Sequence, residues 1–482
     1  MTSTGSKTKR AAGVGDTSKK TLGLVTMALL TTTAVASIRG LPAMAHYGLG
    51  SVFLYVVPAI VFLVPTALVP AELGSGWKGG VFGWVRAAYG DQIGFFAIWQ
   101  QWVQNVVWFP VQLAFFATAL AYVFEPSLSS NGFYVAAIIL VVYWASTLIA
   151  SRGVNAFAAV GSKGMLVGTI IPALALVTLA IIYLATGGKS NIVGASADWI
   201  PAWGGLPSIV LIVSNFLAYA GMEMNAVHVT DMQHPDRNYP RSILLACVLI
   251  LLVFIPTTLA IAVAVPSADL NLTQGVLQAF NALFVQVHLP WGTGIMALLI
   301  VIGILASVVT WIPGPSRGLL MVAQLGYLPP RLQKTNKNDM QMGILTVQGV
   351  LVSVLTILFA IIPSVSAAFW MLSAMSIQFY LLMYIIMFMS GMRLRKIAPE
   401  VHRGFKTPAM TFIASLGIAA SAAALLMGFV KPSGFGISQT AYALVLLIGV
   451  VVLGGAPFLI HHIRQPSWNP KPASASDLAA TS

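Results

Sequence analysis

The sequence predicts an all-helical integral membrane protein, and three observations lead to that prediction. Of the 482 residues, 58% are hydrophobic and only 8% are charged, whereas about 25% of residues are charged in an ordinary soluble domain. The mean hydropathy is +0.88. The apolar runs are about 20 residues long or longer, which is the length that a helix needs to cross a bilayer, and no alternating pattern of barrel strands dominates.

About twelve apolar runs, separated by polar loops with Gly and Pro, are expected to be spans. The first run lacks a small-residue cleavage site and is followed by many others, so we interpret it as a retained helix and not as a signal peptide. Two of the runs are long enough to be tilted or to extend beyond the bilayer, 92–124 and 290–325. The expected spans are 22–46, 51–73, 92–124, 132–150, 161–186, 206–230, 242–266, 290–325, 342–362, 365–392, 409–429 and 440–462.

The net charge of +13 is explained by the orientation of these spans. With a cytoplasmic amino terminus, 22 of the 25 Lys and Arg residues lie inside, Lys189 and Lys431 lie outside, and Arg39 falls within a span. This asymmetry agrees with the positive-inside rule and requires an even number of spans. We therefore expect no nucleic-acid partner.

The two ends of the chain differ from the rest in composition. Residues 1–21 and 464–482 are rich in Ser, Thr, Ala, Gly, Pro and Lys, so we expect disordered cytoplasmic tails on either side of one membrane domain at 22–463. The lone cysteine excludes an internal disulfide framework. Glu72, Trp77 and the Gly79–Gly80 pair are expected to end the second span in a tight cytoplasmic turn.

Two spans combine a formal charge with residues that break helices. The first contains SIRGLP at 37–42, and the sixth contains Gly221 two residues before Glu223. A charged side chain at the bilayer centre costs at least ~2.5 to 3.5 kcal/mol. The first and sixth spans take corresponding positions in two halves of five, which is the pattern of inverted-repeat transporters with discontinuous helices. In that architecture the half-helix ends present backbone N–H and C=O groups that bind the carboxylate and amine of a zwitterion.

Three longer stretches carry a family resemblance: AELGSGWKGGVFGWV (71–85), YAGMEMNAVHVTDMQHPDRNYP (219–240) and WIPGPSRGLLMVAQLGYLP (311–329). They resemble the bacterial glutamate/γ-aminobutyrate antiporter family of the amino acid-polyamine-organocation (APC) superfamily, and the similarity covers essentially all twelve spans. The resemblance implies a LeuT-like 5+5 inverted repeat with discontinuous helices 1 and 6 plus two extra helices. It also implies alternating-access exchange of an amino acid for a related amino acid or its amine product across the bacterial cytoplasmic membrane.

The resemblance also implies roles for particular residues. Glu223 matches a glutamate beside the substrate, Trp311 matches a tryptophan that walls off the site, and Tyr380 and Tyr384 match two tyrosines on one helix face. Two positions depart from the pattern of the glutamate exchanger: Ser307 replaces a glutamate and Arg39 replaces a tyrosine. The short carboxy-terminal tail has no counterpart of that exchanger's plug. The substrate site is therefore expected to comprise Ser37, Ile38, Arg39, Gly40, Tyr219, Ala220, Gly221, Glu223, Ser307, Trp311, Tyr380 and Tyr384.

Several alternatives stay open at this level. Arg39 either pairs with Glu223, contacts substrate, or reaches the outer interface along its aliphatic stem. Glu223 is either a substrate contact or a buried, protonated acid bonded to backbone freed by Gly221. Proton symport is the rival of exchange, whereas a channel or a sensor would need a polar pore lining or a soluble domain. We expect no enzymatic activity, since a membrane enzyme would need clustered intramembrane His, Asp, Glu or Cys, and we expect no cofactor, no metal, and a monomer or homodimer.

Overall fold

The computed structural model describes residues 23–152, 164, 166–224, 226, 232, 234–433 and 435–469. Within them, eleven helices are long and apolar enough to cross a membrane, and each matches one of the runs expected from sequence. These helices are Gly50–Gly76, Asp91–Phe124, Gly132–Ala150, Val167–Ala185, Leu206–Met224, Pro235–Ala264, Gly292–Tyr327, Met342–Ile361, Val365–Ile397, Met410–Met427 and Gln439–His462.

The remaining span, the first, is not a single helix. Helix α1 (Leu24–Val35) ends in extended backbone at Ala36 and Ser37, a single turn follows at Ile38–Gly40, and α2 (Leu41–Ala45) begins. Pro42 lies in the first turn of α2, where no hydrogen bond within the helix needs its missing N–H. In the interior of a helix that continued from α1, the same residue would remove a backbone hydrogen bond. The break that SIRGLP predicts is confirmed.

The sixth span is broken as well. Helices α10 (Leu206–Ile209) and α11 (Val213–Tyr219) are followed by extended backbone at Ala220. Gly221 then has a φ of +110°, a conformation that a side chain would strain. Of the expected run to residue 230, positions 225 and 227–230 lie outside the described residues. Both discontinuous helices predicted from the sequence are therefore present, in agreement with a LeuT-like fold.

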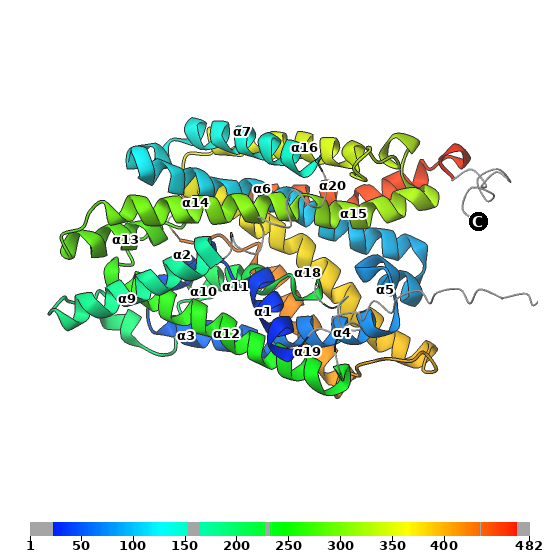
Figure 1. Ribbon diagram of the computed structural model, residues 1–482, viewed down its shortest axis with the longest axis horizontal. Coiled ribbons are helices and arrows are strands. Elements are labelled where there is room, and N and C mark those ends of the chain that lie inside the picture. The colour runs from blue at the N-terminus through cyan, green and yellow to red at the C-terminus, as the bar shows by residue number, and fades with distance from the viewer. Residues whose placement is uncertain are drawn as a thin grey trace, which may run out of the picture.

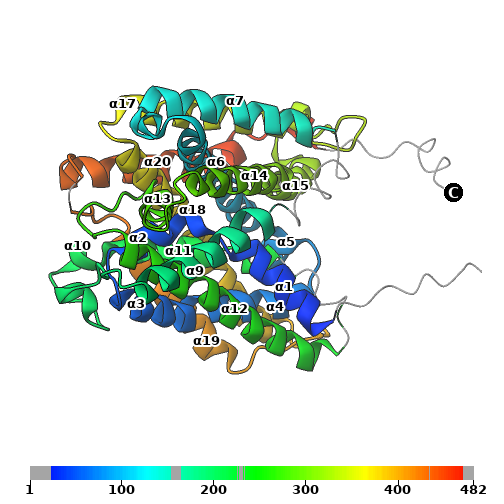
Figure 2. The same cartoon turned by 60° about the vertical axis from the view of Figure 1, so that its left-hand side comes forward.

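Two long helices form the centre of the bundle (Figures 1 and 2). In α6 (Asp91–Phe124) and α18 (Val365–Ile397), 78% and 83% of the most apolar stretch is buried inside the protein. In α19 (Met410–Met427) and α20 (Gln439–His462), the last two spans, the corresponding shares are 28% and 17%. The final pair is therefore peripheral and presents apolar side chains outward.

The other helices surround this centre. Helices α7 and α16 lie along one flank in Figure 1, and α12 and α19 lie along the other. Two short helices in loops, α5 and α13, have no counterpart among the expected spans. The bounds are α3 Gly50–Pro58, α4 Val64–Gly76, α5 Gly80–Tyr89, α7 Gly132–Ala150, α9 Ile171–Ala185, α12 Pro235–Ala264, α13 Gly275–Gln286, α14 Gly292–Trp311, α15 Pro313–Val322, α16 Met342–Thr356 and α17 Leu358–Ile361.

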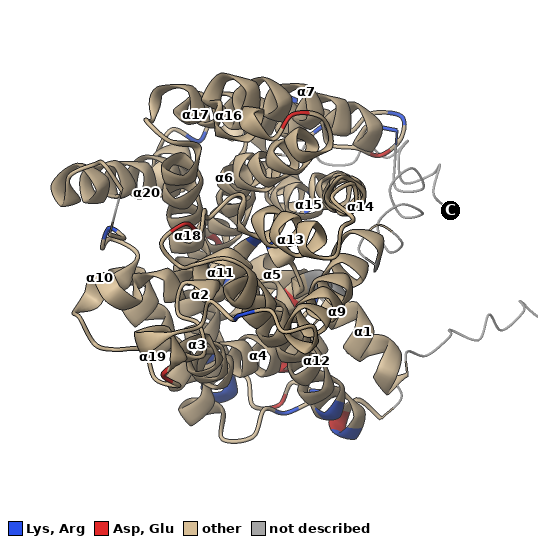
Figure 3. Ribbon diagram, turned by 90° about the vertical axis from the view of Figure 1, so that its left-hand side faces the viewer, with Lys and Arg blue, Asp and Glu red and all other residues tan. Residues whose placement is uncertain are grey.

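The loops at the two ends of the bundle differ in charge, and Figure 3 looks onto the end that has few charged residues. One end, which we call the basic face, includes loops 77–79, 328–341 and 398–409. The opposite end, which we call the vestibule face, includes loops 46–49, 186–205 and 265–274. Glu72 lies at the basic face, one turn before α4 ends, and there it joins an ion-pair cluster with Arg395 and Arg403.

Candidate functional site

Glu223 lies just beyond the break of the sixth span and is only 2% exposed. Its Oε1 accepts hydrogen bonds from Gln101 Nε2 at 2.9 Å and from the Tyr380 hydroxyl at 2.6 Å, and its Oε2 accepts one from the Tyr384 hydroxyl. Three donors from α6 and α18 therefore hold this buried carboxylate. Hydrogen bonds to a charged group are about twice as strong as those between neutral groups, so the side chain is fixed in place.

Tyr384 also holds the backbone at the break. Its hydroxyl oxygen accepts a hydrogen bond from the Gly221 N–H at 2.9 Å. Tyr380 and Tyr384 stack with ring centroids 5.0 Å apart, as expected for residues one turn apart on α18. The Gly221 N–H is thus bound by a tyrosine and, among the described residues, not by Glu223.

Arg39 lies in the turn between α1 and α2 and is 7% exposed. Among the described residues, its Nε and Nη1 atoms have no hydrogen-bond partner. The guanidinium carbon lies 5.9 Å from the ring centroid of Trp108 and 5.8 Å from that of Phe369, at the outer limit of a cation–π contact. A buried charge without a hydrogen-bonded partner is costly, so this guanidinium is a candidate for binding an anion.

The hypothesised pairing of Arg39 with Glu223 is wrong for this conformation. Both side chains are described, and no nitrogen of Arg39 lies within 4.0 Å of a carboxylate oxygen in the part of the chain that the structure covers. The alternative that Arg39 reaches the interface is wrong as well, because the residue is buried in the protein. The donors around Glu223 are neutral groups, and the Arg39 guanidinium has no ion-pair partner in the part of the chain that the structure describes.

The aromatic wall expected near Trp311 includes a second tryptophan. Trp311 is the last residue of α14, and its ring centroid lies 6.0 Å from that of Trp108, which in turn faces Arg39. Ser307 lies one turn earlier on α14 and is half-buried. Arg39, Trp108 and Trp311 therefore form a continuous series of contacts from the first span to the eighth.

The remaining predicted residues take several positions. Ser37 Oγ accepts a hydrogen bond from the Arg39 N–H at 3.4 Å, whereas the Ile38 side chain is in the hydrophobic core. Gly40 and Ala220 contribute backbone at the two breaks. The Tyr219 hydroxyl donates to the Tyr55 carbonyl oxygen at 2.9 Å, so this side chain is used in packing the sixth span against the second.

Sequence reasoning missed the contribution of the third span. Gln100, Gln101, Gln104 and Asn105 are buried in α6, and Gln104 Nε2 donates to Ser376 Oγ on α18 at 3.1 Å. The signal was present as QQWVQN at 100–105, with four amides in six residues of an otherwise apolar span. Such a cluster inside a bilayer needs polar partners. Here Gln101 of the cluster donates to Glu223.

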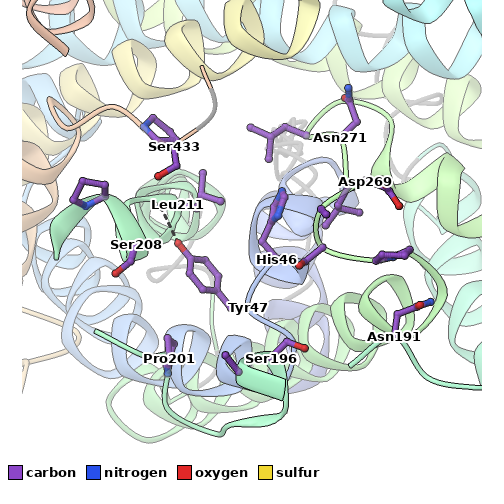
Figure 4. Close-up of a pocket in the computed structure, with 18 of the residues that line it drawn as sticks. His46, Tyr47, Asn191, Ser196, Pro201, Ser208, Leu211, Asp269, Asn271 and Ser433 are labelled. Atoms are coloured by element: carbon purple, nitrogen blue, oxygen red, sulfur yellow. Dashed lines mark hydrogen bonds between the residues drawn. The ribbon is translucent and has the colours of Figure 1, made fainter. Parts of the chain in front are cut away.

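A cavity of about 950 Å³ opens at the vestibule face (Figure 4). It begins at His46, the residue after α2, and extends past Asn191, Asp269 and Asn271. Tyr47 narrows it by accepting a hydrogen bond from the Leu211 N–H at 3.3 Å. His46 follows Arg39 by seven residues, of which α2 supplies five, so at about 1.5 Å per residue it lies roughly 10 Å along the chain from the break.

No group of three or more His, Cys, Asp or Glu residues in the described ranges is placed to hold a metal ion. The arrangement instead suits a small polar molecule, because it combines one unneutralised guanidinium, one fixed carboxylate and two backbone breaks within an apolar shell. This is the type of site found between the repeats of secondary transporters.

Comparison with known proteins decides the family. Residues 22–452 match the amino acid permease family. The chain belongs to that family. The match covers both discontinuous spans and most of the last one, so it includes the whole site described above.

Individual relatives of this amino acid permease agree. It is 35% identical over 442 residues to an uncharacterised transporter of Legionella pneumophila, covering 90% of this chain and 95% of the relative. It is 30% identical over 461 residues to the glutamate/gamma-aminobutyrate antiporter of Lactococcus lactis strain IL1403, covering 92% and 91%. A probable agmatine/putrescine antiporter of the same strain is 25% identical over 367 residues, covering 75% and 77%. The family resemblance inferred from the three sequence motifs is confirmed.

Proposed function

We propose that this permease is an antiporter that exchanges an amino acid for a related amino acid or for an amine product that keeps a carboxylate. The observation that carries the proposal is the buried guanidinium of Arg39, which has no carboxylate partner among the residues that the structure describes. An incoming carboxylate would supply the missing partner and would gain a charge-assisted hydrogen bond in a water-poor site.

Charge favours one of the two substrate classes named for the relatives. Agmatine and putrescine, named for one relative, are cationic amines, and Arg39 would repel them. Glutamate and γ-aminobutyrate, named for another relative, each carry at least one carboxylate. Glu223 forms no ion pair with Arg39, since its two oxygens accept hydrogen bonds from Gln101, Tyr380 and Tyr384.

We further propose that the basic face is cytoplasmic. The positive-inside rule places Lys- and Arg-rich loops in the cytoplasm, and five such residues lie at 393–406. The 950 Å³ cavity would then open outward and admit substrate from outside the cell. An impermeant maleimide tests this orientation: a cysteine replacing Lys189 should react in intact cells, and one replacing Lys334 only after lysis. The reverse pattern would refute it.

Counterflow in proteoliposomes tests exchange. Labelled glutamate uptake should require preloading with glutamate or γ-aminobutyrate and should survive a protonophore that collapses the proton gradient. Uptake into empty vesicles that disappears with the protonophore would establish proton symport, the rival mechanism. Uptake of putrescine in preference to both amino acids would refute the assigned substrate class.

The same vesicles test the role of Arg39. We expect Arg39→Gln to lose most carboxylate uptake, and Arg39→Lys to retain part of it because the charge remains while the forked geometry is lost. Equal uptake by the wild type and Arg39→Gln would show that this guanidinium does not bind the substrate.

A further inference from the structure

A second cavity lies at the basic face, between α6, α15, α16 and α20, and its chemistry differs from that of the site above. Its volume is about 230 Å³. The walls are apolar and comprise Trp99, Trp102, Leu319, Leu328, Pro329, Leu332, Ile344, Val347, Ile460, Ile463 and Trp468. An apolar cavity of about 150 Å³ already suffices to bind a molecule such as benzene and stays free of water. These walls favour a hydrocarbon occupant over a polar one.

The two innermost tryptophans present hydrocarbon surface to this cavity. The Trp99 Nε1–H donates to the Leu453 carbonyl oxygen at 2.7 Å, and the Trp102 Nε1–H donates to Gln348 Oε1 at 2.9 Å. Both indole N–H groups are thus satisfied by the protein, so neither requires a polar ligand.

The mouth of the cavity faces the bilayer. Val347 on α16 is 40% exposed, and Ile463 after α20 is 53% exposed. Both continue the outward apolar faces of their helices, on which Val350 and Leu459 are 52% and 63% exposed. A lipid chain can enter sideways between the two helices without passing through water.

The rim adds positive charge. Arg331 directly precedes the wall residue Leu332, is exposed, and has no side-chain partner among the described residues. Lys334 and Lys337 follow in the same exposed loop, where Asp339 is the only acid. On the other side of the mouth, Arg464 directly follows Ile463.

The two arginines at the mouth, Arg331 and Arg464, differ in whether their guanidinium groups are free to bind a ligand. Arg464 already donates to Asn469 Oδ1 at 2.7 Å and lies 4.1 Å over the Tyr327 ring, so it is held in place. Arg331 is therefore the guanidinium that is free to bind a headgroup.

We propose that this cavity holds one acyl chain of an anionic phospholipid whose phosphate binds Arg331. Charge complementarity selects this occupant over a neutral lipid, because basic pockets between helices at the cytoplasmic side bind anionic headgroups. Hydrocarbon burial supplies most of the affinity, and the rim charge supplies the selectivity.

The test uses the full-length protein in phosphatidylcholine nanodiscs that contain a small fraction of lipid brominated on its acyl chains. Bromine quenches nearby indole emission, and Trp99 and Trp102 line the cavity. We expect brominated phosphatidylglycerol to quench about twofold more than brominated phosphatidylcholine at equal fraction, because the rim is cationic.

Matched variants separate the two parts of the site. Val347→Phe should fill the mouth and remove the excess quenching, whereas Val350→Phe, on the same helix but outside the cavity, should leave it unchanged. Leu332→Phe fills the cavity from the opposite wall and serves if Val347→Phe folds poorly. Arg331→Gln should remove the preference for phosphatidylglycerol, and Lys78→Gln, an exposed cation of another basic-face loop, should not.

Two results would overturn the assignment. Equal quenching by the two brominated lipids in the wild type would mean that the cavity is empty or is filled by the chain's own residues 470–482. Unchanged excess quenching in both Val347→Phe and Leu332→Phe would place the bound lipid elsewhere.

Discussion

Glu72 and Glu223 are both buried and both accept hydrogen bonds from α18, but the donors differ: Glu72 is bound by guanidiniums and Glu223 by neutral groups. Glu72 accepts hydrogen bonds from Arg395 Nε at 2.8 Å and Nη2 at 2.6 Å and from the Thr407 N–H at 2.7 Å, and Arg403 Nε lies 3.3 Å away. Glu223 accepts its bonds from an amide and two phenols. At the basic face, opposite charges meet directly. At the helix breaks they do not, and Nε and Nη1 of Arg39 have no hydrogen-bond partner among the described residues.

We infer that the Glu72 cluster serves stability, whereas the region of Arg39 and Glu223 serves the proposed function. The Glu72 cluster joins the end of α4 to the loop before α19, with Thr407 Oγ1 donating to the Leu68 carbonyl oxygen at 2.8 Å. Glu72 is paired there with Arg395, and Arg403 donates from Nη1 and Nη2 to backbone carbonyl oxygens, although its Nε has no hydrogen-bond partner among the described residues. The region of Arg39 and Glu223 is stable only at the cost of one unsatisfied guanidinium, which is the arrangement that a substrate can complete.

The largest expected effect is the loss of Glu72. Glu72→Ala leaves two guanidiniums together without their carboxylate, which should destabilise the protein by roughly 3 to 5 kcal/mol. Thermal unfolding in detergent measures this change. Glu400→Ala, which removes an exposed carboxylate from the neighbouring loop, is the control and should unfold like the wild type. A small effect of Glu72→Ala would mean that the cluster does not hold the basic face together.

The second prediction concerns Glu223→Gln. The amide keeps the volume but loses the charge that three donors share, so we expect a destabilisation of about 1.5 to 3 kcal/mol. Counterflow should fall more than tenfold, whereas the exposed Glu125→Gln should transport normally. If transport survives, the carboxylate of Glu223 is structural.

The third prediction has the opposite sign. Arg39→Met removes a buried, unpaired charge and should stabilise the empty protein by on the order of 2 kcal/mol. At the same time, glutamate should no longer raise its melting temperature, because the ligand loses its partner. A lower melting temperature for the empty Arg39→Met protein would show that the Arg39 side chain has a favourable contact that outweighs its burial.

A fourth comparison uses the two tyrosines of α18. Tyr384→Phe loses the contacts with both Glu223 and the Gly221 N–H, whereas Tyr380→Phe loses only a contact with Glu223. We expect Tyr384→Phe to cost about 1 kcal/mol more in thermal stability, and to lower the apparent affinity for substrate further. Equal effects would mean that the bond to the Gly221 N–H does not stabilise the break.

The smallest effect is expected at Ser307. No hydrogen bond of its hydroxyl is recorded among the described residues, so Ser307→Ala should change stability by less than about 0.5 kcal/mol. A large change in substrate affinity with unchanged stability would identify the hydroxyl as a substrate contact, which measurement of transport at several concentrations would reveal.

The architecture could be read from the sequence because its signals are local. Each span is a run of apolar residues, and the break at 37–42 is marked by Gly40 and Pro42 within such a run. Gly221 marks the second break in the same way, since its φ of +110° is one that few other residues adopt. The Glu72 turn is also as expected: α4 ends at Gly76, and Gly79 and Gly80 have positive φ.

The contacts within the site could not be read in the same way. Gln101 and Glu223 are 122 residues apart, so only the packing of α6 against the sixth span reveals their bond. The pairing of the two intramembrane charges looked natural because both were unpaired in the sequence. Instead, Glu223 accepts hydrogen bonds from uncharged donors on α6 and α18. A comparison of the formal charges in the sequence cannot predict these bonds.

The hydroxyl of Tyr384 limits how a bound molecule can be oriented. A phenol has one proton and two lone pairs; the proton goes to Glu223, and one lone pair receives the Gly221 N–H. Any further atom that meets this oxygen must bring its own hydrogen, as an ammonium does. In the proposed site, an amino acid would therefore lie with its nitrogen toward α18 and its carboxylate toward Arg39 in the first span.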